Sequence, residues 1–305
     1  MSTVKPLLWR GRMVHFAKRV LLIYLVVMAV VAWLQRSLMF PAAKTELLLV
    51  AEYPAATGIF AAASDVAIVA GDHQTIRGWM LQSDKKRSDR LVILFHGNGG
   101  DRSRRWGWYE LLRSINVDVL AMDYRGYADS DGSPSEKTLT QDATATWKYA
   151  TQTLGYQPGQ IILLGESLGG GVGVKLASTI CQQGEEPAGL VLVSTFSSML
   201  DTASNRFWWL PVRFLLLDRF RSDLEIGHVT CPVLQFHGTV DSIIPLRLGQ
   251  RLHELTPSQA SNGIEKKLII FNGTNHNDVL DRHGVELRDA IRKFIEQTRN
   301  DLAKK

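Results

Sequence analysis

Short apolar runs alternate with longer amphipathic segments along most of this chain. Short apolar runs bounded by polar turns predict buried strands, and an apolar repeat every three to four residues predicts a helix. The predicted strands span residues 65–70, 75–82, 91–95, 117–122, 161–164, 190–194, 233–236 and 267–271. The predicted helices span residues 103–114, 136–154, 172–181, 246–255 and 278–300. We therefore expect an α/β fold: a mostly parallel eight-stranded sheet that begins with an antiparallel pair and carries helices on both faces.

The N-terminal region carries the longest apolar run, residues 20–34. This run is shorter than the roughly 20 residues that span a bilayer, but the flanking Lys18, Arg19 and Arg36 can extend their charged ends to the interface. We therefore expect a transmembrane anchor helix. A cleaved signal peptide is the main alternative, although residues 41–43 offer only an imperfect cleavage site, and a peripheral or core helix is the third.

Positive charge is concentrated in the same region. The formal net charge is +5, and residues 1–40 hold six basic residues and no acidic one, so the remainder carries −1. That balance gives no support to nucleic-acid binding. Five of the six basic residues precede the apolar run, so we expect a cytoplasmic N-terminus and an extracytoplasmic domain, in the periplasm if the source is bacterial. We divide the chain into a basic anchor (1–40), a linker that wraps onto the domain (41–63) and the domain itself (64–305).

One strand is followed at once by the sequence Gly165-Glu166-Ser167-Leu168-Gly169 and then by a helix. A Gly-x-Ser-x-Gly turn between a strand and a helix exposes the serine on a strained backbone, and side chains at the two glycines would crowd the strand against the helix. Ser167 is therefore our candidate nucleophile. The alternative is a serine that only caps the helix.

A serine hydroxyl needs a base and a third group that orients the base. His276 and Asp241 both lie just after predicted strands and follow Ser167 in the order serine, acid, histidine. The other candidate histidines lie in helices, in connections or at a strand terminus. Asp123 precedes the serine, and Asp278 is too close to His276 along the chain. We predict a triad of Ser167, Asp241 and His276.

The oxyanion formed by nucleophilic attack needs fixed hydrogen-bond donors. The backbone N–H of Leu168 at the helix start is one candidate, and the N–H of Asn98 in the glycine-rich turn after residue 95 is the other. That turn could instead need its glycines only for their dihedral angles. Cys181 and Cys231 lack metal-ligand spacing to any histidine, so we expect two buried thiols, with one disulfide as the alternative, and no metal or cofactor.

Six motifs occur in a fixed order along the chain. They are His96-Gly97-Asn98-Gly99-Gly100, Asp123-Tyr124-Arg125-Gly126-Tyr127 with Ser130, Gly132 and Pro134, Gly165-Glu166-Ser167-Leu168-Gly169-Gly170, Cys231-Pro232, His237-Gly238 with Asp241, and His276-Asn277-Asp278. This set resembles the α/β-hydrolase fold family, and within it the Bem46-like group of membrane-anchored serine hydrolases with the ABHD13 and ABHD17 type proteins. The resemblance implies the same triad and the same two oxyanion donors.

The chain departs from that family at one position of the site. The family commonly has glycine immediately before the catalytic histidine, and this chain has Asn275. Asparagine adopts a left-handed backbone more readily than most residues, so we expect the turn to be kept.

The resemblance implies hydrolysis of carboxylic esters or thioesters by a serine hydrolase. A peptidase or amidase on the same fold and a non-catalytic membrane-tethered binding protein are the alternatives. Residues 200–229 include many aromatic and aliphatic side chains and lie where such folds place a lid. We expect a lid-like segment there that suits an acyl-chain or lipid-like substrate, with helices packed on the core as the alternative.

Overall fold

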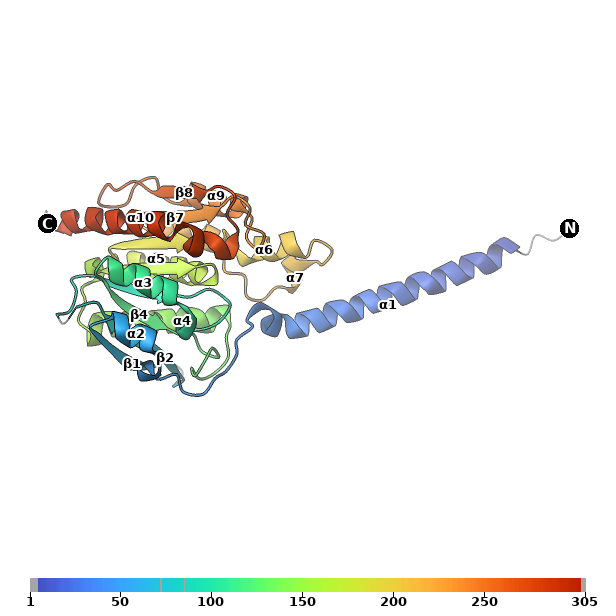
Figure 1. Ribbon diagram of the computed structural model, residues 1–305. Coiled ribbons are helices and arrows are strands. Elements are labelled where there is room, and N and C mark those ends of the chain that lie inside the picture. The colour runs from blue at the N-terminus through green and yellow to red at the C-terminus, as the bar shows by residue number, and fades with distance from the viewer. Residues whose placement is uncertain (1–4, 72, 85, 303–305) are drawn as a thin grey trace.

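We describe a computed structural model of the chain, which covers residues 5–71, 73–84 and 86–302. Its centre is one eight-stranded sheet (Figure 1). The strands are β1 (Ala62–Val69), β2 (Thr75–Gln82), β3 (Leu91–Phe95), β4 (Asp118–Met122), β5 (Ile161–Glu166), β6 (Gly189–Val193), β7 (Val233–Gly238) and β8 (Lys267–Phe271). Residues 1–4, at the start of the predicted basic terminus, and Asp72, in the predicted turn between the first two strands, lie outside the described residues.

The strand order is β1-β2-β4-β3-β5-β6-β7-β8. β2 pairs antiparallel with β1 and β4, and every other pairing is parallel. The mostly parallel eight-stranded sheet is therefore confirmed. β5 lies within a block of six parallel strands, β3 to β8. The loops at the carboxyl ends of these strands meet at one edge, which is where open α/β sheets place their sites.

Helices cover both faces of the sheet. The longer ones are α3 (Trp106–Ser114), α4 (Glu136–Lys148), α5 (Leu168–Gln182), α9 (Leu246–Leu255) and α10 (Val279–Leu302). The short ones are α2 (Pro54–Ile59), α6 (Met199–Arg206), α7 (Val212–Leu215) and α8 (Ser222–Glu225). Apolar residues of α4, α5 and α9 join one buried cluster, and those of α2, α3 and α10 join the other.

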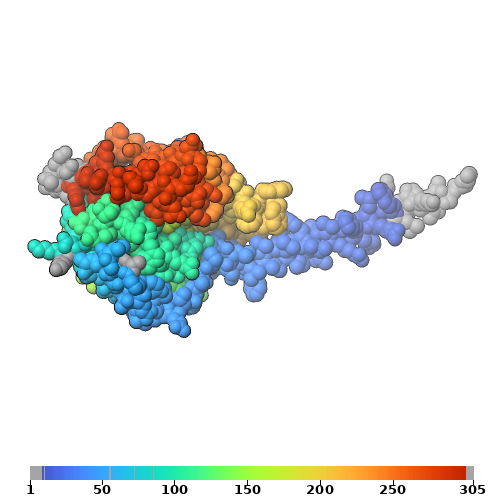
Figure 2. Space-filling model, in the orientation of Figure 1, coloured from blue at the N-terminus to red at the C-terminus, as the bar shows by residue number. Residues whose placement is uncertain are grey.

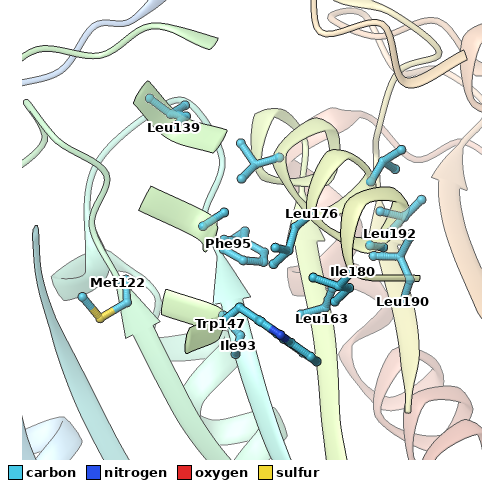
Figure 3. Packing of buried hydrophobic residues seen from close by; sticks show 14 of the residues in the cluster. Ile93, Phe95, Met122, Leu139, Trp147, Leu163, Leu176, Ile180, Leu190 and Leu192 are labelled. Atoms are coloured by element: carbon cyan, nitrogen blue, oxygen red, sulfur yellow. The ribbon is translucent and has the colours of Figure 1, made fainter. Parts of the chain in front are cut away.

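Alternate side chains of each central strand supply these two clusters. In β3, Ile93 and Phe95 face the cluster beneath α4 and α5, whereas Val92 and Leu94 face the opposite cluster. Figure 3 shows Trp147 of α4 and Leu176 of α5 packed over the first of these faces. Strands buried on both faces in this way hold the edge at their carboxyl ends in a rigid frame.

The helix α1 (Lys5–Met39) projects away from the domain (Figure 1). Its part from Gly11 to Met39 is long and apolar enough to cross a membrane; the most apolar stretch of 18 residues within it has a mean hydropathy of 2.1, and none of that stretch is buried in the protein. Phe40, directly after α1, is buried against the domain. The chain therefore carries one apolar N-terminal helix that suits an anchor or a signal sequence.

Several helix boundaries differ from the sequence prediction. α5 begins at Leu168, directly after the serine, rather than at residue 172, because the glycines after Ser167 allow the helix to pack closely on the sheet. The helix predicted over 136–154 is α4 followed by a π-helical turn, Tyr149–Thr153. The segment 103–114 divides into the 3₁₀ turn Arg102–Arg104 and α3.

Candidate active site

Ser167 lies on the sharp turn between β5 and α5. Its backbone has φ 53° and ψ −113°, a left-handed conformation that costs energy for a residue with a side chain. The neighbouring glycines make the turn possible. A Cβ at Gly165 would lie 2.5 Å from the carbonyl oxygen of Gly169, and a Cβ at Gly169 would lie 2.0 Å from that of Phe95. Backbone packing between strand and helix therefore presents the serine at the sheet edge.

The structure brings the three residues of the predicted triad together. The Nε2 atom of His276 lies 3.0 Å from Oγ of Ser167, and its Nδ1 atom lies 2.7 Å from Oδ2 of Asp241. The other carboxylate oxygen of Asp241 accepts hydrogen bonds from the N–H groups of Ile243 at 3.0 Å and Ile244 at 2.7 Å. Asp241 is buried, so the carboxylate is fixed in the orientation that contacts the imidazole.

Asn275 connects the loop of Asp241 to the loop of His276. Its Oδ1 atom accepts from the N–H of Ser242 at 2.9 Å, from the hydroxyl of Ser242 at 3.0 Å and from the N–H of His276 at 2.8 Å. Its backbone is extended, with φ −92° and ψ 175°, so the expectation that this position needs left-handed tolerance is wrong. The asparagine side chain holds this turn by accepting hydrogen bonds.

The candidates that we set aside lie elsewhere in the structure. His237 is buried, its Nε2 atom lies 2.8 Å from the carbonyl oxygen of Ile244, and burial lowers its pKa. His283 stacks on Phe271 and contacts the hydroxyl of Thr274. Neither of these two histidines contacts Ser167 among the residues that the structure describes, so His276 is the imidazole within reach of the nucleophile.

Leu168 directly follows the serine, and the turn that holds Asn98 lies close to it: a Cβ at Gly97 would lie 3.6 Å from Cβ of Ser167. Leu168 begins α5, so its N–H has no partner within the helix and points out of the helix N-terminus. The side chain of Asn98 is held at both ends: its Oδ1 atom accepts from the hydroxyl of Tyr127 at 2.7 Å and its Nδ2 atom donates to the carbonyl of Met39. The hydrogen bond from Asn98 to Met39 joins this turn to the end of α1. Of the glycines in the turn, Gly100 has a left-handed φ of 74°.

A buried charged cluster supports the same turn from behind. Asp123 accepts from the backbone N–H of Arg102 at 2.8 Å and pairs with its guanidinium, which also pairs with Asp129. Burial raises the pKa of Asp123 to about 6, although Arg102 opposes the shift. Burial also lowers the pKa of His96 to about 3 and keeps its imidazole neutral 3.3 Å from Asp123. This cluster anchors the turn and lies apart from the triad.

Comparisons with known proteins agree with this geometry. A family model described as the alpha/beta hydrolase fold matches residues 90–229. Uncharacterized protein Rv2307c of Mycobacterium tuberculosis is 35% identical over 245 residues, which cover 80% of this chain and 83% of that protein. The chain belongs to the α/β-hydrolase family. The expected superfamily is thereby confirmed, while the narrower likeness to the Bem46-like group with ABHD13 and ABHD17 type proteins stays a prediction.

Two further proteins that resemble this chain have activities in their names. Lysophosphatidylserine lipase ABHD12 of Danio rerio is 34% identical over 203 residues, which cover 61% of this chain and 53% of that protein. The chain thus spans about half the length of that relative. The esterase Pf2001 of Pyrococcus furiosus shares the fold, with a TM-score of 0.62, 19% sequence identity and coverage of 77% of this chain and 91% of that one.

Two groups at this site carry no clear signal in the sequence. Asn275 and Ser242 are common loop residues, and only their approach in space makes them a bridge between two loops. Glu166 is the second: its carboxylate lies 3.5 Å from the guanidinium of Arg105, which also bonds the carbonyl of Gly99. Such a pairing depends on the placement of a loop some sixty positions away, so the motif around Ser167 does not reveal it.

Proposed function

We propose that this α/β hydrolase is a serine hydrolase that cleaves carboxylic ester or thioester bonds through an acyl-enzyme intermediate. The observation that carries the proposal is the continuous hydrogen-bonded line from Asp241 through His276 to Ser167 at the carboxyl ends of parallel strands. Esterase and lipase names among the relatives support the same reaction class.

The geometry assigns a role to each group. Asp241 accepts the Nδ1 proton of His276, so the lone pair of Nε2 faces the serine hydroxyl. His276 removes the proton of Ser167 as Oγ attacks the substrate carbonyl carbon. The imidazolium then returns that proton to the leaving alcohol or thiol, and an acyl-serine forms. Water, deprotonated by His276, hydrolyses the acyl-serine and releases the acid.

The oxyanion of each tetrahedral intermediate needs donors that are in place beforehand. We assign this role to the backbone N–H groups of Leu168, which follows Ser167 at the start of α5, and of Asn98, in the turn after β3. No hydrogen bond within the described part of the chain uses either N–H. The side-chain contacts of Asn98 with Tyr127 and Met39 support a preformed position for its backbone.

The N-terminal helix supports a location at a membrane. We assign α1 as an uncleaved anchor, with the N-terminus in the cytoplasm and the catalytic domain, residues 64–305, on the opposite side. A relative named lysophosphatidylserine lipase supports esters with a lipid-like acyl chain as substrates. The lid-like segment 200–229 at the catalytic edge fits that substrate class.

This function can be tested with the full chain in vesicles or nanodiscs. The measurement is the rate at which the chain hydrolyses esters of increasing chain length and the matched thioesters. Ser167→Ala should lose turnover by on the order of 10⁶. Ser133→Ala is the matched control and should leave turnover unchanged, because Ser133 is exposed and its side chain makes no hydrogen bond with the residues that the structure describes. Hydrolysis that persists in Ser167→Ala, or a wild-type protein that cleaves no member of the series, would contradict the proposal.

A further inference from the structure

The segment that runs from the end of α6 through α7 exposes an unusual amount of apolar surface. We call residues 207–217 the cap tip. Trp208 is 83% exposed and Phe214 is 87% exposed, and Leu217 is exposed as well. The cap tip protrudes from the domain toward α1 (Figure 2). Contiguous exposed aromatic surface of this kind marks an interaction site in proteins that are otherwise well packed.

Three contacts fix the cap tip against α1. The hydroxyl of Tyr24 donates to the carbonyl of Trp209 at 3.0 Å, and the N–H of Leu217 donates to Oε1 of Gln35 at 2.9 Å. Directly after the tip, Asp218 pairs with Arg36 at 2.8 Å. The two segments are about 180 positions apart in the sequence, so these contacts belong to the tertiary structure.

The contacts place the cap tip beside the apolar part of α1. Arg36 marks the polar end of the helix next to the domain, whereas Tyr24 lies inside the apolar run. At a rise of about 1.5 Å per residue, Tyr24 lies about 18 Å along the helix axis from Arg36. That distance exceeds half of the roughly 30 Å hydrocarbon core. If α1 spans the bilayer, the end of the cap tip at Trp209 therefore lies at a depth where lipid surrounds the helix.

The charges of the cap tip and of the residue just before it suit a membrane interface. No acidic residue occurs between Asp201 and Asp218, while Arg206 and Arg213 lie in this stretch beside the aromatic side chains. Arginine and tryptophan together are typical of segments that lie at the boundary between lipid headgroups and acyl chains. A soluble partner that bound this patch would have to share its space with α1 and with the lipid around that helix.

The end of α1 contacts both the turn that holds Asn98 and the segment directly after the cap tip. The carbonyl of Met39, at the end of α1, accepts from the side chain of Asn98 in the proposed oxyanion turn. Phe40 packs edge-to-face on Phe220 just beyond the cap tip, with ring centroids 6.3 Å apart. The helix α1 therefore links the cap tip to the turn beside Ser167.

We propose that the cap tip inserts into the lipid bilayer beside α1 and forms a second membrane contact, so that substrate reaches Ser167 laterally from the lipid. The partner is a phospholipid bilayer with an anionic component that pairs with Arg206 and Arg213. This inference rests on the proposed role of α1 as an anchor. It adds a second inserted element and a direction of substrate entry.

Depth-dependent fluorescence quenching tests the insertion in the full chain reconstituted into vesicles of phosphatidylcholine and phosphatidylglycerol. Trp208→Cys carries a polarity-sensitive label at the cap tip. Val30→Cys on α1 is the positive control, and Val285→Cys, an exposed position on α10, is the negative control. The unchanged chain, whose Cys181 and Cys231 are buried, measures background labelling.

Insertion predicts that lipids with a quencher on the acyl chain quench the labels at positions 208 and 30, and that iodide in the buffer quenches the label at position 285. Quenching at 30 without quenching at 208 would overturn this inference and leave the anchor intact. Absence of lipid quenching at both positions would overturn the anchor as well. A label at 208 that is shielded from both quenchers only at high protein density would instead indicate a second copy of the chain and also overturn the inference.

Turnover gives a second readout that does not depend on labelling. The double variant Trp208→Ser/Phe214→Ser should hydrolyse a long-chain ester embedded in vesicles about tenfold more slowly, and a short water-soluble ester at the wild-type rate. Val69→Ser, which removes an exposed apolar side chain on β1, should change neither rate. Equal loss on both esters, or no loss on either, would contradict lateral entry from the lipid.

Discussion

The two sides of the hydrogen-bonded triad are held in different ways. Ser167 is held in place by the packing of backbone atoms: the close approach of strand and helix at Gly165 and Gly169 fixes the strained turn between them. His276 and Asp241 lie on separate loops, which are held to each other by hydrogen bonds through the side chain of Asn275. The serine side is therefore part of the folded core, whereas the imidazole side depends on a few individual bonds.

This difference predicts two kinds of damage. A change on the serine side must disturb the contact between the sheet and α5, because a new side chain would overlap backbone atoms that cannot move alone. A change on the imidazole side can alter one hydrogen bond and leave the core intact. Stability should report on the first side and turnover on the second.

Among changes that keep the nucleophile, the largest effect is expected on the imidazole side, from Asp241→Asn. An amide NH₂ facing His276 would favour the tautomer whose Nε2 carries the proton, so the imidazole could not accept the proton of Ser167. We expect kcat to fall by about 10⁴-fold with little change in stability. Steady-state kinetics on an ester measures the loss. Asp278→Asn is the matched control, and a loss in that variant with normal turnover in Asp241→Asn would show that the wrong acid had been assigned.

Gly169→Ala tests the serine side. The added methyl group would lie 2.0 Å from the carbonyl oxygen of Phe95, so strand β3 and helix α5 would have to separate. We expect the free energy of unfolding to fall by about 1–3 kcal/mol or more, together with loss of turnover. Urea denaturation measures the change. Gly227→Ala, where the methyl group has no neighbour within 4 Å, is the control. Equal stability of the two variants would contradict the account of the turn.

A smaller effect should follow from Asn275→Ala, which removes three hydrogen bonds from the link between the Asp241 and His276 loops. A shift of the imidazole by a fraction of an ångström lowers kcat, and we expect a loss of about 10- to 100-fold with KM nearly constant. Asn275→Asp keeps an acceptor oxygen and should recover part of the rate. Asn262→Ala is the control, because Asn262 lies in a remote loop and its side chain also accepts a backbone hydrogen bond. A change in KM alone would indicate substrate contact instead of positioning.

The smallest effect concerns pH and the cluster behind the oxyanion turn. The pKa of His96 is lowered by burial from 6.5 to about 3, so the unfolded chain binds a proton between these values and the folded chain does not. The contribution of the neutral His96 to the free energy of unfolding is therefore complete above pH 6.5 and is lost as the pH falls toward 3. Asp123 acts in the opposite sense, because its raised pKa of about 6 lets the folded chain take up a proton first.

His96→Asn should therefore flatten the decline of stability in acid, by on the order of 1 kcal/mol between pH 7 and 4.5. Urea midpoints at these two pH values measure the change. The exposed His228→Asn is the control. A decline as steep in His96→Asn as in the wild type would mean that His96 is not held neutral.

The sequence was informative where the determining interactions are local. The apolar runs located the strands to within a few residues, and the glycine spacing located Ser167 on its turn because both depend on neighbours along the chain. Asp241 and His276 could be selected because loops at the ends of parallel strands meet at one edge. The bridge at Asn275 and the contact between Tyr24 and Trp209 could not be predicted, since each depends on how separate segments pack.

Mass spectrometry of the full chain after reaction with a fluorophosphonate tests the central claim most directly, because this reagent modifies a serine only where a base activates it. We predict one phosphonylated residue, Ser167, and a labelling rate that falls by several orders of magnitude in His276→Ala. Modification of a different serine, or equal labelling of Ser167 without the imidazole, would contradict the account.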